Sequence, residues 1–266
     1  MSHTTGPEPE DVAEHLRHPV SELSDADAAV AVDDLEGPDL PNLPLIDASA
    51  QTPADVKPTW RGWLHAGTFP VTIIGGIVLI SLAQGAPAKW ASAVFTLTSM
   101  LLFGNSALYH RFDWKPRTKV LLKRIDHANI VLLIAGTYTP IAVLALPTNQ
   151  AVLLLSLVWG GAVISILFRV FWINAPRWLY VALYLLLGWA AVMYLPQLWG
   201  ASKAMVILVA IGGLLYTGGA IVYAMKRPNP WPRHFGFHEI FHVCTVLAFL
   251  CHWTACLIIA VNPLYP

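Results

Sequence analysis

Two histidines near the C-terminal end of the chain, His238 and His242, have the spacing of paired metal ligands on a helix. Residues at positions i and i+4 lie on one helix face about one turn apart, so both imidazoles can reach one ion. Zinc accepts such nitrogen ligands at about 2.0–2.1 Å in tetrahedral geometry. A third histidine, His110, ends an earlier apolar segment and can supply a third nitrogen. Three protein ligands leave a fourth position for water, which is the arrangement of catalytic rather than structural zinc.

An acidic residue, Asp126, opens the apolar segment that follows His110. It can act as a helix N-cap or first-turn acid, which the helix dipole favours. Its carboxylate can also orient a water at the metal and take its proton, because zinc lowers the pKa of that water to about 7. Ser106, one turn before His110 on the same helix face, either joins this network or packs as an ordinary serine.

The letters from His238 to His242 also read H-E-I-F-H, the H-E-x-x-H pattern of zinc proteases, in which the glutamate is the general base. Glu239 lies about 100° around the helix from His238, so it either reaches the water or faces the membrane interface. The pattern is short and has a high false-positive rate, so a protease remains one hypothesis among several.

Three other histidines fit the metal site less well. His234 follows Pro232 in a loop and is expected to face solvent. His252 lies ten residues beyond His242, more than halfway across a bilayer, and is expected to be a buried, hydrogen-bonded imidazole. His65, near the start of the first apolar segment, is a weaker candidate ligand.

Seven apolar segments are long enough to position these residues in a membrane. A bilayer core of ~30 Å requires about 20 apolar residues per helix. The chain of 266 residues is 56% hydrophobic and only 12% charged, whereas soluble domains are about a quarter charged. We therefore predict an all-α integral membrane protein with seven transmembrane helices, at residues 63–83, 90–109, 125–146, 151–172, 178–199, 204–225 and 237–261.

The basic residues predict how these helices are oriented. Twelve of the 16 Lys and Arg residues lie beside one set of segment ends, whereas Lys89 and Lys203 alone lie beside the other set. The positive-inside rule then places the N-terminus in the cytoplasm and the C-terminus outside. Under this topology His110, Asp126 and the pair His238 and His242 come to one depth from three helices. The metal site is therefore predicted at the cytoplasmic face of a cell membrane.

A different composition precedes the membrane domain, which we assign to residues 59–266. Of the 16 Asp and Glu residues, 13 lie within residues 1–55, together with Pro, Ala and Ser and few large apolar side chains. Such a segment buries too little apolar surface to offset the entropy of ordering. Residues 1–58 are accordingly predicted to be a disordered acidic tail on the cytoplasmic side.

Two stretches of the chain resemble the signatures of the hemolysin III proteins, the bacterial branch of the progestin and adipoQ receptor family that includes the adiponectin receptors. They are SALYHRFDWKPRTKVLLKRIDHANIVLLIAGTYTP, from Ser106 to Pro140, and FGFHEIFHVCTVLAFLCH, from Phe235 to His252. The resemblance covers about residues 60–262. It implies a bacterial membrane protein with seven helices, its N-terminus inside, and one zinc ion near the cytoplasmic surface.

The resemblance also implies roles for individual residues. The family's histidine on the second span corresponds to His110, and its H-x-x-x-H pair corresponds to His238 and His242. Its aspartate at the head of the third span corresponds to Asp126, and its serine one turn before the first histidine corresponds to Ser106. The receptor branch has a neutral residue at the position of Glu239, which counts against a protease.

Three functions remain open besides a protease. The first is a zinc-dependent hydrolase of a lipid amide or ester, as in the alkaline ceramidases of the wider superfamily. The second is a pore or cytolysin, although the evenly apolar spans offer no charged stripe to line a conduit. The third is a receptor or sensor in which zinc is structural. The expected partners are membrane lipids, with a lipid as substrate and no nucleic acid.

Overall fold

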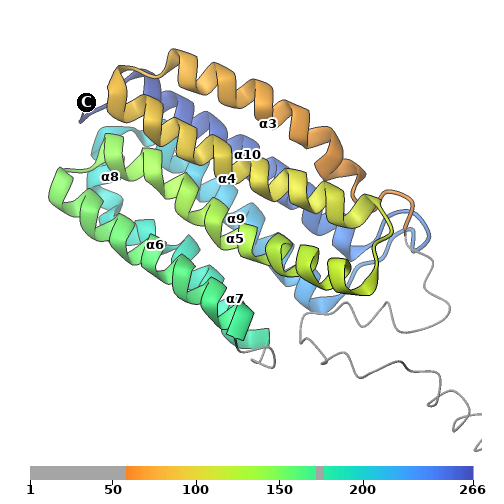
Figure 1. Cartoon of the computed structure of the whole chain (residues 1–266). Helices are drawn as coiled ribbons and strands as arrows, with labels where there is room; N and C mark the ends of the chain where they lie inside the picture. The colour runs from red at the N-terminus through yellow and green to blue at the C-terminus, as the bar shows by residue number, and fades with distance from the viewer. Residues whose placement is uncertain (1–57, 172–176, 266) are drawn as a thin grey trace, which may run out of the picture. The chain divides into compact units, whose positions relative to one another are not determined.

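The computed structural model of the chain describes residues 58–171 and 177–265. The acidic tail predicted for residues 1–58 lies outside the described residues except for Pro58, and so does Trp172, the predicted last residue of the fourth span. In the described part the backbone is almost entirely helical (Figure 1). The helices are α3 (Trp63–Leu82), α4 (Gly85–Arg111), α5 (Pro116–Ala145), α6 (Thr148–Phe171), α7 (Arg177–Gly188), the 3₁₀ helix η2 (Ala190–Tyr194), α8 (Leu195–Ala201), α9 (Lys203–Met225) and α10 (Phe237–Val261).

Seven helical segments among the described residues are long and apolar enough to cross a membrane, which confirms the predicted fold class. They run alternately up and down, so that α3, α5, α7 and α10 begin at the end where α4 and α9 finish (Figure 1). This end carries the loops at residues 112–115 and 226–236, with their Lys and Arg residues, and is called the basic end below.

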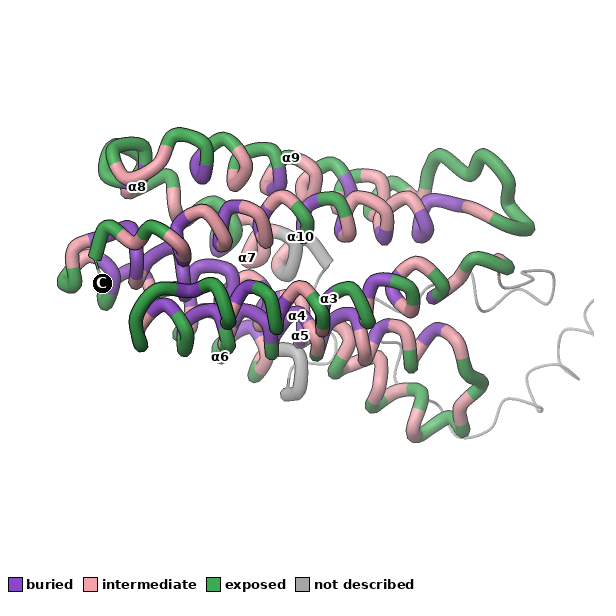
Figure 2. The backbone as a smooth tube through the Cα atoms, turned by 90° about the horizontal axis from the view of Figure 1, so that it is seen from above, coloured by how far each residue is buried: buried purple, intermediate pink, exposed green. Residues whose placement is uncertain are grey.

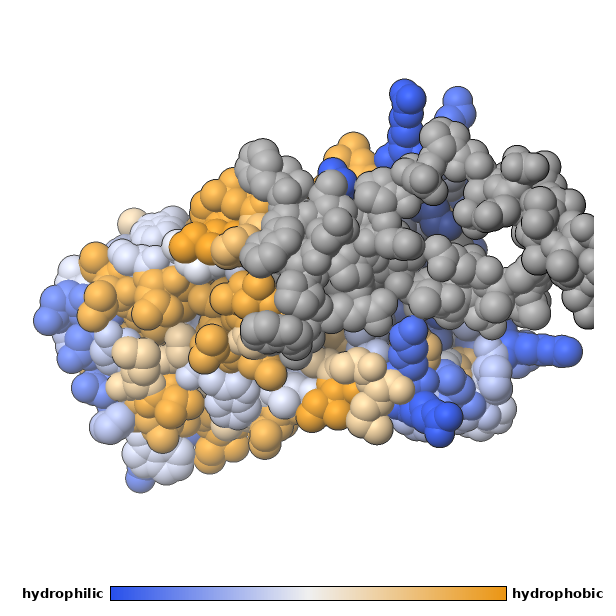
Figure 3. Space-filling model, turned by 90° about the horizontal axis from the view of Figure 1, so that it is seen from below, coloured by the Kyte–Doolittle hydropathy of each residue, from blue (hydrophilic) through white to orange (hydrophobic). Residues whose placement is uncertain are grey.

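The outer surface of the bundle is apolar, as a membrane requires. Large hydrophobic side chains point outward on several helices, among them Ile74, Leu186 and Leu214, each more than 60% exposed. Figure 3 shows a hydrophobic band across the middle of the visible face, with hydrophilic residues at both ends. Exposed apolar surface of this extent would promote aggregation in water, but it matches the hydrocarbon of a bilayer.

Helix α5 has the most central position in the bundle. Within its most apolar window 72% of the residues are buried, compared with 17–50% in the other six spans. It packs against α4, α6 and α10, while α10 also packs against α3 and α9. Buried residues lie along the sides of these helices that face their neighbours (Figure 2). The residues of α4, α5 and α10 at the basic end are therefore held by packing along the whole bundle.

The start of α5 differs from the prediction. The third span was predicted to begin at residue 125, but the helix begins at Pro116. Proline suits the first turn of a helix because its missing N–H has no intrahelical partner there. Asp126 is therefore three turns inside the helix, and the prediction that it serves as an N-cap or first-turn acid is wrong. Hydropathy marks where a helix enters the apolar core, but a helix can continue beyond it through polar residues.

The fifth span is interrupted, although its sequence predicted one continuous helix. Helix α7 ends at Gly188, η2 follows, and α8 begins at Leu195 with Pro196 in its first turn. The Tyr138 hydroxyl of α5 donates to the Gly188 carbonyl at 2.8 Å and accepts from the Ala191 N–H at 2.9 Å. In a bilayer such freed backbone groups need partners from the protein, and this side chain supplies them.

Candidate metal centre

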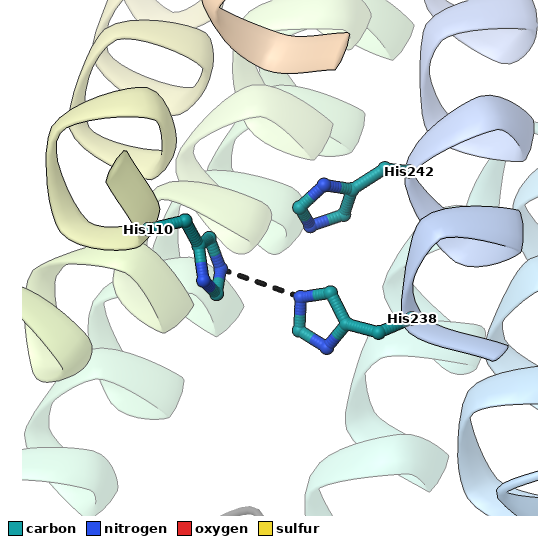
Figure 4. Close-up of side chains that lie close together, drawn as sticks. All are labelled: His110, His238 and His242. Atoms are coloured by element: carbon teal, nitrogen blue, oxygen red, sulfur yellow. Dashed lines mark hydrogen bonds between the residues drawn. The ribbon is translucent and has the colours of Figure 1, made fainter. Parts of the chain in front are cut away.

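Three histidines converge inside the basic end of the bundle. His110 comes from the last turn of α4, and His238 and His242 come from the first two turns of α10. Their side chains are buried, with exposures of 8%, 6% and 2% respectively. Figure 4 shows the rings turned toward one another across the space between the two helices. One ring nitrogen of each histidine lies within 4.8 Å of the other two.

The distance between two of these nitrogens equals the spacing expected around a tetrahedral ion. The Nε2 atoms of His110 and His238 are 3.3 Å apart. Two nitrogens bound at ~2.05 Å to one tetrahedral ion would be about 3.3 Å apart as well. One hydrogen bond can satisfy only two of three buried imidazoles whose nitrogens face one point, whereas an ion satisfies all three. The residues present therefore fit a metal bound by three histidines.

Asp126 lies beside this cluster and outside the set of three. Its Oδ2 is 3.9 Å from Nε2 of His110, the same nitrogen that faces His238. The side chains of Ser106 and Asn105 on α4 lie near the Asp126 carboxyl group. Ser106 is 3% exposed. Both roles predicted for this serine, ordinary packing and a polar network with Asp126, fit this position.

Glu239, the acid of the H-E-I-F-H sequence, is fully buried and has two structural partners. Its Oε1 forms an ion pair with Nε of Arg61, which precedes α3. Its Oε2 accepts a hydrogen bond of 2.8 Å from the Gly236 N–H, which caps α10. Both carboxylate oxygens are thus engaged in holding the helix start. This arrangement does not support Glu239 as the general base of a protease.

His65 lies closer to the cluster than its sequence position suggested. Its ring stacks on that of His242 with 3.8 Å between centroids and 14° between planes. It is 3% exposed, and neither ring nitrogen has a hydrogen-bond partner among the described residues. Because stacked rings are parallel, their nitrogens cannot be directed at one ion, and His65 is not part of the three-histidine set. The sequence already placed His65 in the first turn of a span that begins at the basic end, and this position was the signal that it lies near the cluster.

The two remaining predictions for histidines are confirmed. His234 is exposed in the loop before α10, with its Nδ1 3.0 Å from the Thr59 hydroxyl. His252 is buried deep in α10, and its Nε2 lies 3.3 Å from the carbonyl oxygen of Val209 on α9. Neither belongs to the cluster at the basic end.

A groove of about 370 Å³ opens between α3, α4 and α5. Its walls are apolar, with Phe69, Leu101 and Ile125 among them, and Leu101 and Ile125 are themselves about 40% exposed on the outer surface. The only polar side chains in it are Asn105 and Asn129. Asn105 also lies near the Asp126 carboxyl group, and its side-chain amide donates to the Leu122 carbonyl at 3.2 Å. The groove therefore connects the lipid-facing surface with a residue at the edge of the metal centre.

The chain is similar to a known protein family and to two of its members. The model of the family described as "Haemolysin-III related" matches residues 54–253. The "Hemolysin-3 homolog" of Bacillus subtilis (strain 168) is 34% identical over 170 residues, which cover 62% of this chain and 76% of that protein. The "Hemolysin-3" of Bacillus cereus is 31% identical over 144 residues, covering 53% of this chain and 65% of its own length. With seven apolar spans and a family match that includes all three clustered histidines, the chain is a multi-pass membrane protein that belongs to the haemolysin III related family.

Proposed function

We propose that the protein is a zinc-dependent membrane hydrolase that cleaves a lipid amide or ester at the cytoplasmic face of the plasma membrane. The observation that carries this proposal is the buried three-histidine set with a carboxylate 3.9 Å from one of its nitrogens. A structural zinc site is usually closed by four protein ligands, whereas three ligands and a nearby acid are typical of hydrolytic sites.

Zinc is the metal that suits this donor set best. Three neutral imidazoles are borderline ligands that favour zinc over magnesium or calcium, which prefer oxygen. When bound there by His110, His238 and His242, zinc would polarise a carbonyl group and lower the pKa of water.

The chain's own residues would manage the proton. Asp126 is close enough to the cluster to accept a proton from water and pass it to the leaving group. Ser106 and Asn105 lie near its carboxyl group, and hydrogen bonds from them would fix the direction of the acceptor oxygen, a positioning that hydrolytic catalysis requires. The burial of the three histidines would keep bulk water from the site.

A lipid substrate fits the surroundings of the site. The cluster lies inside a bundle whose outer faces are apolar, so a substrate dissolved in the bilayer could approach from the side. The groove between α3, α4 and α5 offers an apolar surface that reaches Asn105. These features support a substrate with an acyl chain and a polar linkage.

Two measurements on detergent-purified protein test the proposal. Metal content by mass spectrometry should show near-stoichiometric zinc in the parent and none in the His238→Ala/His242→Ala double variant. Asp126→Asn should keep its zinc and lose roughly 10²–10⁴-fold in the hydrolysis of a panel of lipid amides and esters, because the proton acceptor is gone.

The outcomes separate the remaining hypotheses. A parent without zinc, purified free of chelators, would refute the hydrolase. Zinc in the parent without turnover of any lipid would favour a receptor or sensor with structural zinc. Equal activity of Asp126→Asn and the parent would remove Asp126 from the reaction.

A pore or cytolysin is the second candidate, and it is favoured by the names of the two Bacillus relatives. Purified protein would then release a dye from liposomes. If His110→Ala releases the dye as fast as the parent, the leakage is independent of the metal centre.

A further inference from the structure

The ligands of the metal centre come from two helices that make little direct contact. His110 is on α4 and the other two histidines are on α10, yet α4 and α10 touch only sparsely. Helix α3 packs extensively against α4 and also against α10. Helix α5 also packs against both α4 and α10, so α3 and α5 together hold the two ligand groups in place. At the basic end, the start of α3 contacts the neighbourhood of each ligand group directly.

Three consecutive residues there contact both sides of the centre. Arg61 pairs with the buried Glu239 of α10, the neighbour of His238 in sequence. Gly62, with φ +82°, lies so close to α4 that a Cβ atom on it would come within 2.8 Å of Cβ of His110. The Trp63 ring lies 4.1 Å below the guanidinium of Arg111, the residue after His110. Residues 61–63 are called the α3 clamp below.

The α3 clamp is itself fixed to the loop that leads into α10. The Thr59 N–H donates to the Arg233 carbonyl at 3.2 Å, and the Trp60 N–H donates to the His234 carbonyl at 3.3 Å. Glu239 joins the two sides, because its second oxygen accepts from the Gly236 N–H at the end of the same loop. The Glu239 carboxylate is fully buried and both its oxygens have partners, so its role is to hold these segments in place. Removing Arg61 would leave its charge uncompensated.

We propose that Arg61 and Glu239 are positioning residues of the metal centre: their ion pair closes the α3 clamp, holds His110 at bonding distance from the α10 histidines, and retains the ion. This inference rests on the proposed zinc site. It gives the glutamate of the H-E-I-F-H sequence a role different from that in zinc proteases, because it acts through Arg61 and does not touch the reacting atoms.

The test is a comparison of Arg61→Met, Glu239→Gln and the double variant, with Arg117→Met as a matched control that removes an exposed charge at the same end. Methionine and glutamine preserve side-chain size, and the double variant leaves no buried charge unpaired. At saturating zinc all variants should bind the metal, but release to a chelator should be on the order of tenfold faster in each single variant. The double variant should resemble the singles, because one interaction is lost only once. Arg117→Met should match the parent.

A second measurement does not depend on the metal. In metal-free protein, the amide hydrogens of Thr59 and Trp60 should exchange faster in Glu239→Gln than in the parent and in Arg117→Met. Unchanged exchange together with unchanged zinc release would overturn the clamp. Faster release in Glu239→Gln but not in Arg61→Met would also overturn it, because Glu239 would then act on the ion directly. A parent without zinc would refute the proposed function, and hydrogen exchange would still decide on the clamp.

Discussion

His242 and His252 are buried in the same helix, ten residues apart, yet their surroundings differ in kind. Around His242 the side chains of α3 and α4 supply further imidazoles, with His65 stacked on it and His110 5.2 Å away between ring centroids. His252 instead faces α9, where it meets the backbone carbonyl of Val209 and the ring of Tyr216. His242 therefore has other imidazoles as neighbours, whereas His252 has a backbone carbonyl as its hydrogen-bond acceptor.

The difference shows what distinguishes a metal site from a buried polar residue in a membrane bundle. Burial is the same for both histidines, at 2% and 9% exposure, so burial does not separate them. What separates them is convergence, because among the described residues separate helices direct several nitrogen atoms to one point only at the basic end. The Nε2 of His252 has a single backbone carbonyl as its partner, whereas the three facing imidazoles can hold one cation together.

The largest expected effect tests this comparison directly. His110→Ala removes one of three nitrogens, and we expect zinc affinity to fall at least about 100-fold, the scale on which even outer-shell changes act. His252→Ala removes an imidazole from the same membrane-spanning core and should leave zinc affinity unchanged. Competition with a chromogenic chelator measures both. A loss of zinc in His252→Ala equal to that in His110→Ala would show that packing of α10, and not ligation, controls binding.

A smaller effect is expected at the other polar feature of the core, the interruption of the fifth span. Tyr138→Phe leaves the Gly188 carbonyl and the Ala191 N–H without the hydroxyl that bonds both. Unsatisfied backbone groups of this kind cost about 1–3 kcal/mol, so the free energy of unfolding in detergent should fall by that amount. Zinc affinity should not change, since Tyr138 lies 12 residues beyond Asp126 on α5 and contacts the fifth span, whereas the three histidines are on α4 and α10. A changed zinc affinity would contradict this separation between core and site.

The sequence predicted the seven spans and the convergence of the three histidines because both depend on one-dimensional quantities. Runs of about 20 apolar residues define the spans. Because the chain reverses direction after each span, the order of the spans determines which helix ends lie on the same side of the membrane. His110, His238 and His242 could be grouped in this way without knowing how any helix is rotated about its axis. The span from residue 237 to 261 coincides with α10 for the same reason, because Gly236 and Asn262 bound an uninterrupted apolar run.

What the sequence did not predict depends on contacts between residues far apart in the chain. The pairing of Arg61 with Glu239 joins positions separated by 178 residues, and it requires a particular rotation of α10. The break after Gly188 depends on a tyrosine 50 residues earlier. The early start of α5 was not predicted because its first turns are polar, and hydropathy does not indicate a helix there. Rotation, distant partners and polar helix ends are all invisible to a count of apolar residues.

The smallest expected effect concerns His65, which lies beside the cluster but is not one of its three ligands. It therefore sharpens the comparison between histidines that bind a metal and histidines that are only buried. Its ring lies flat on His242 and edge-on to Phe103, 5.1 Å between centroids, and so limits the rotation of His242. His65→Phe keeps a flat ring and should change zinc affinity little, whereas His65→Ala frees His242 and should weaken zinc binding a few-fold, about 0.5–1.5 kcal/mol for a lost stacked pair. Zinc competition on both variants measures the difference. If His65→Phe loses as much zinc as His110→Ala, the nitrogens of His65 are needed, and the metal centre contains four histidines.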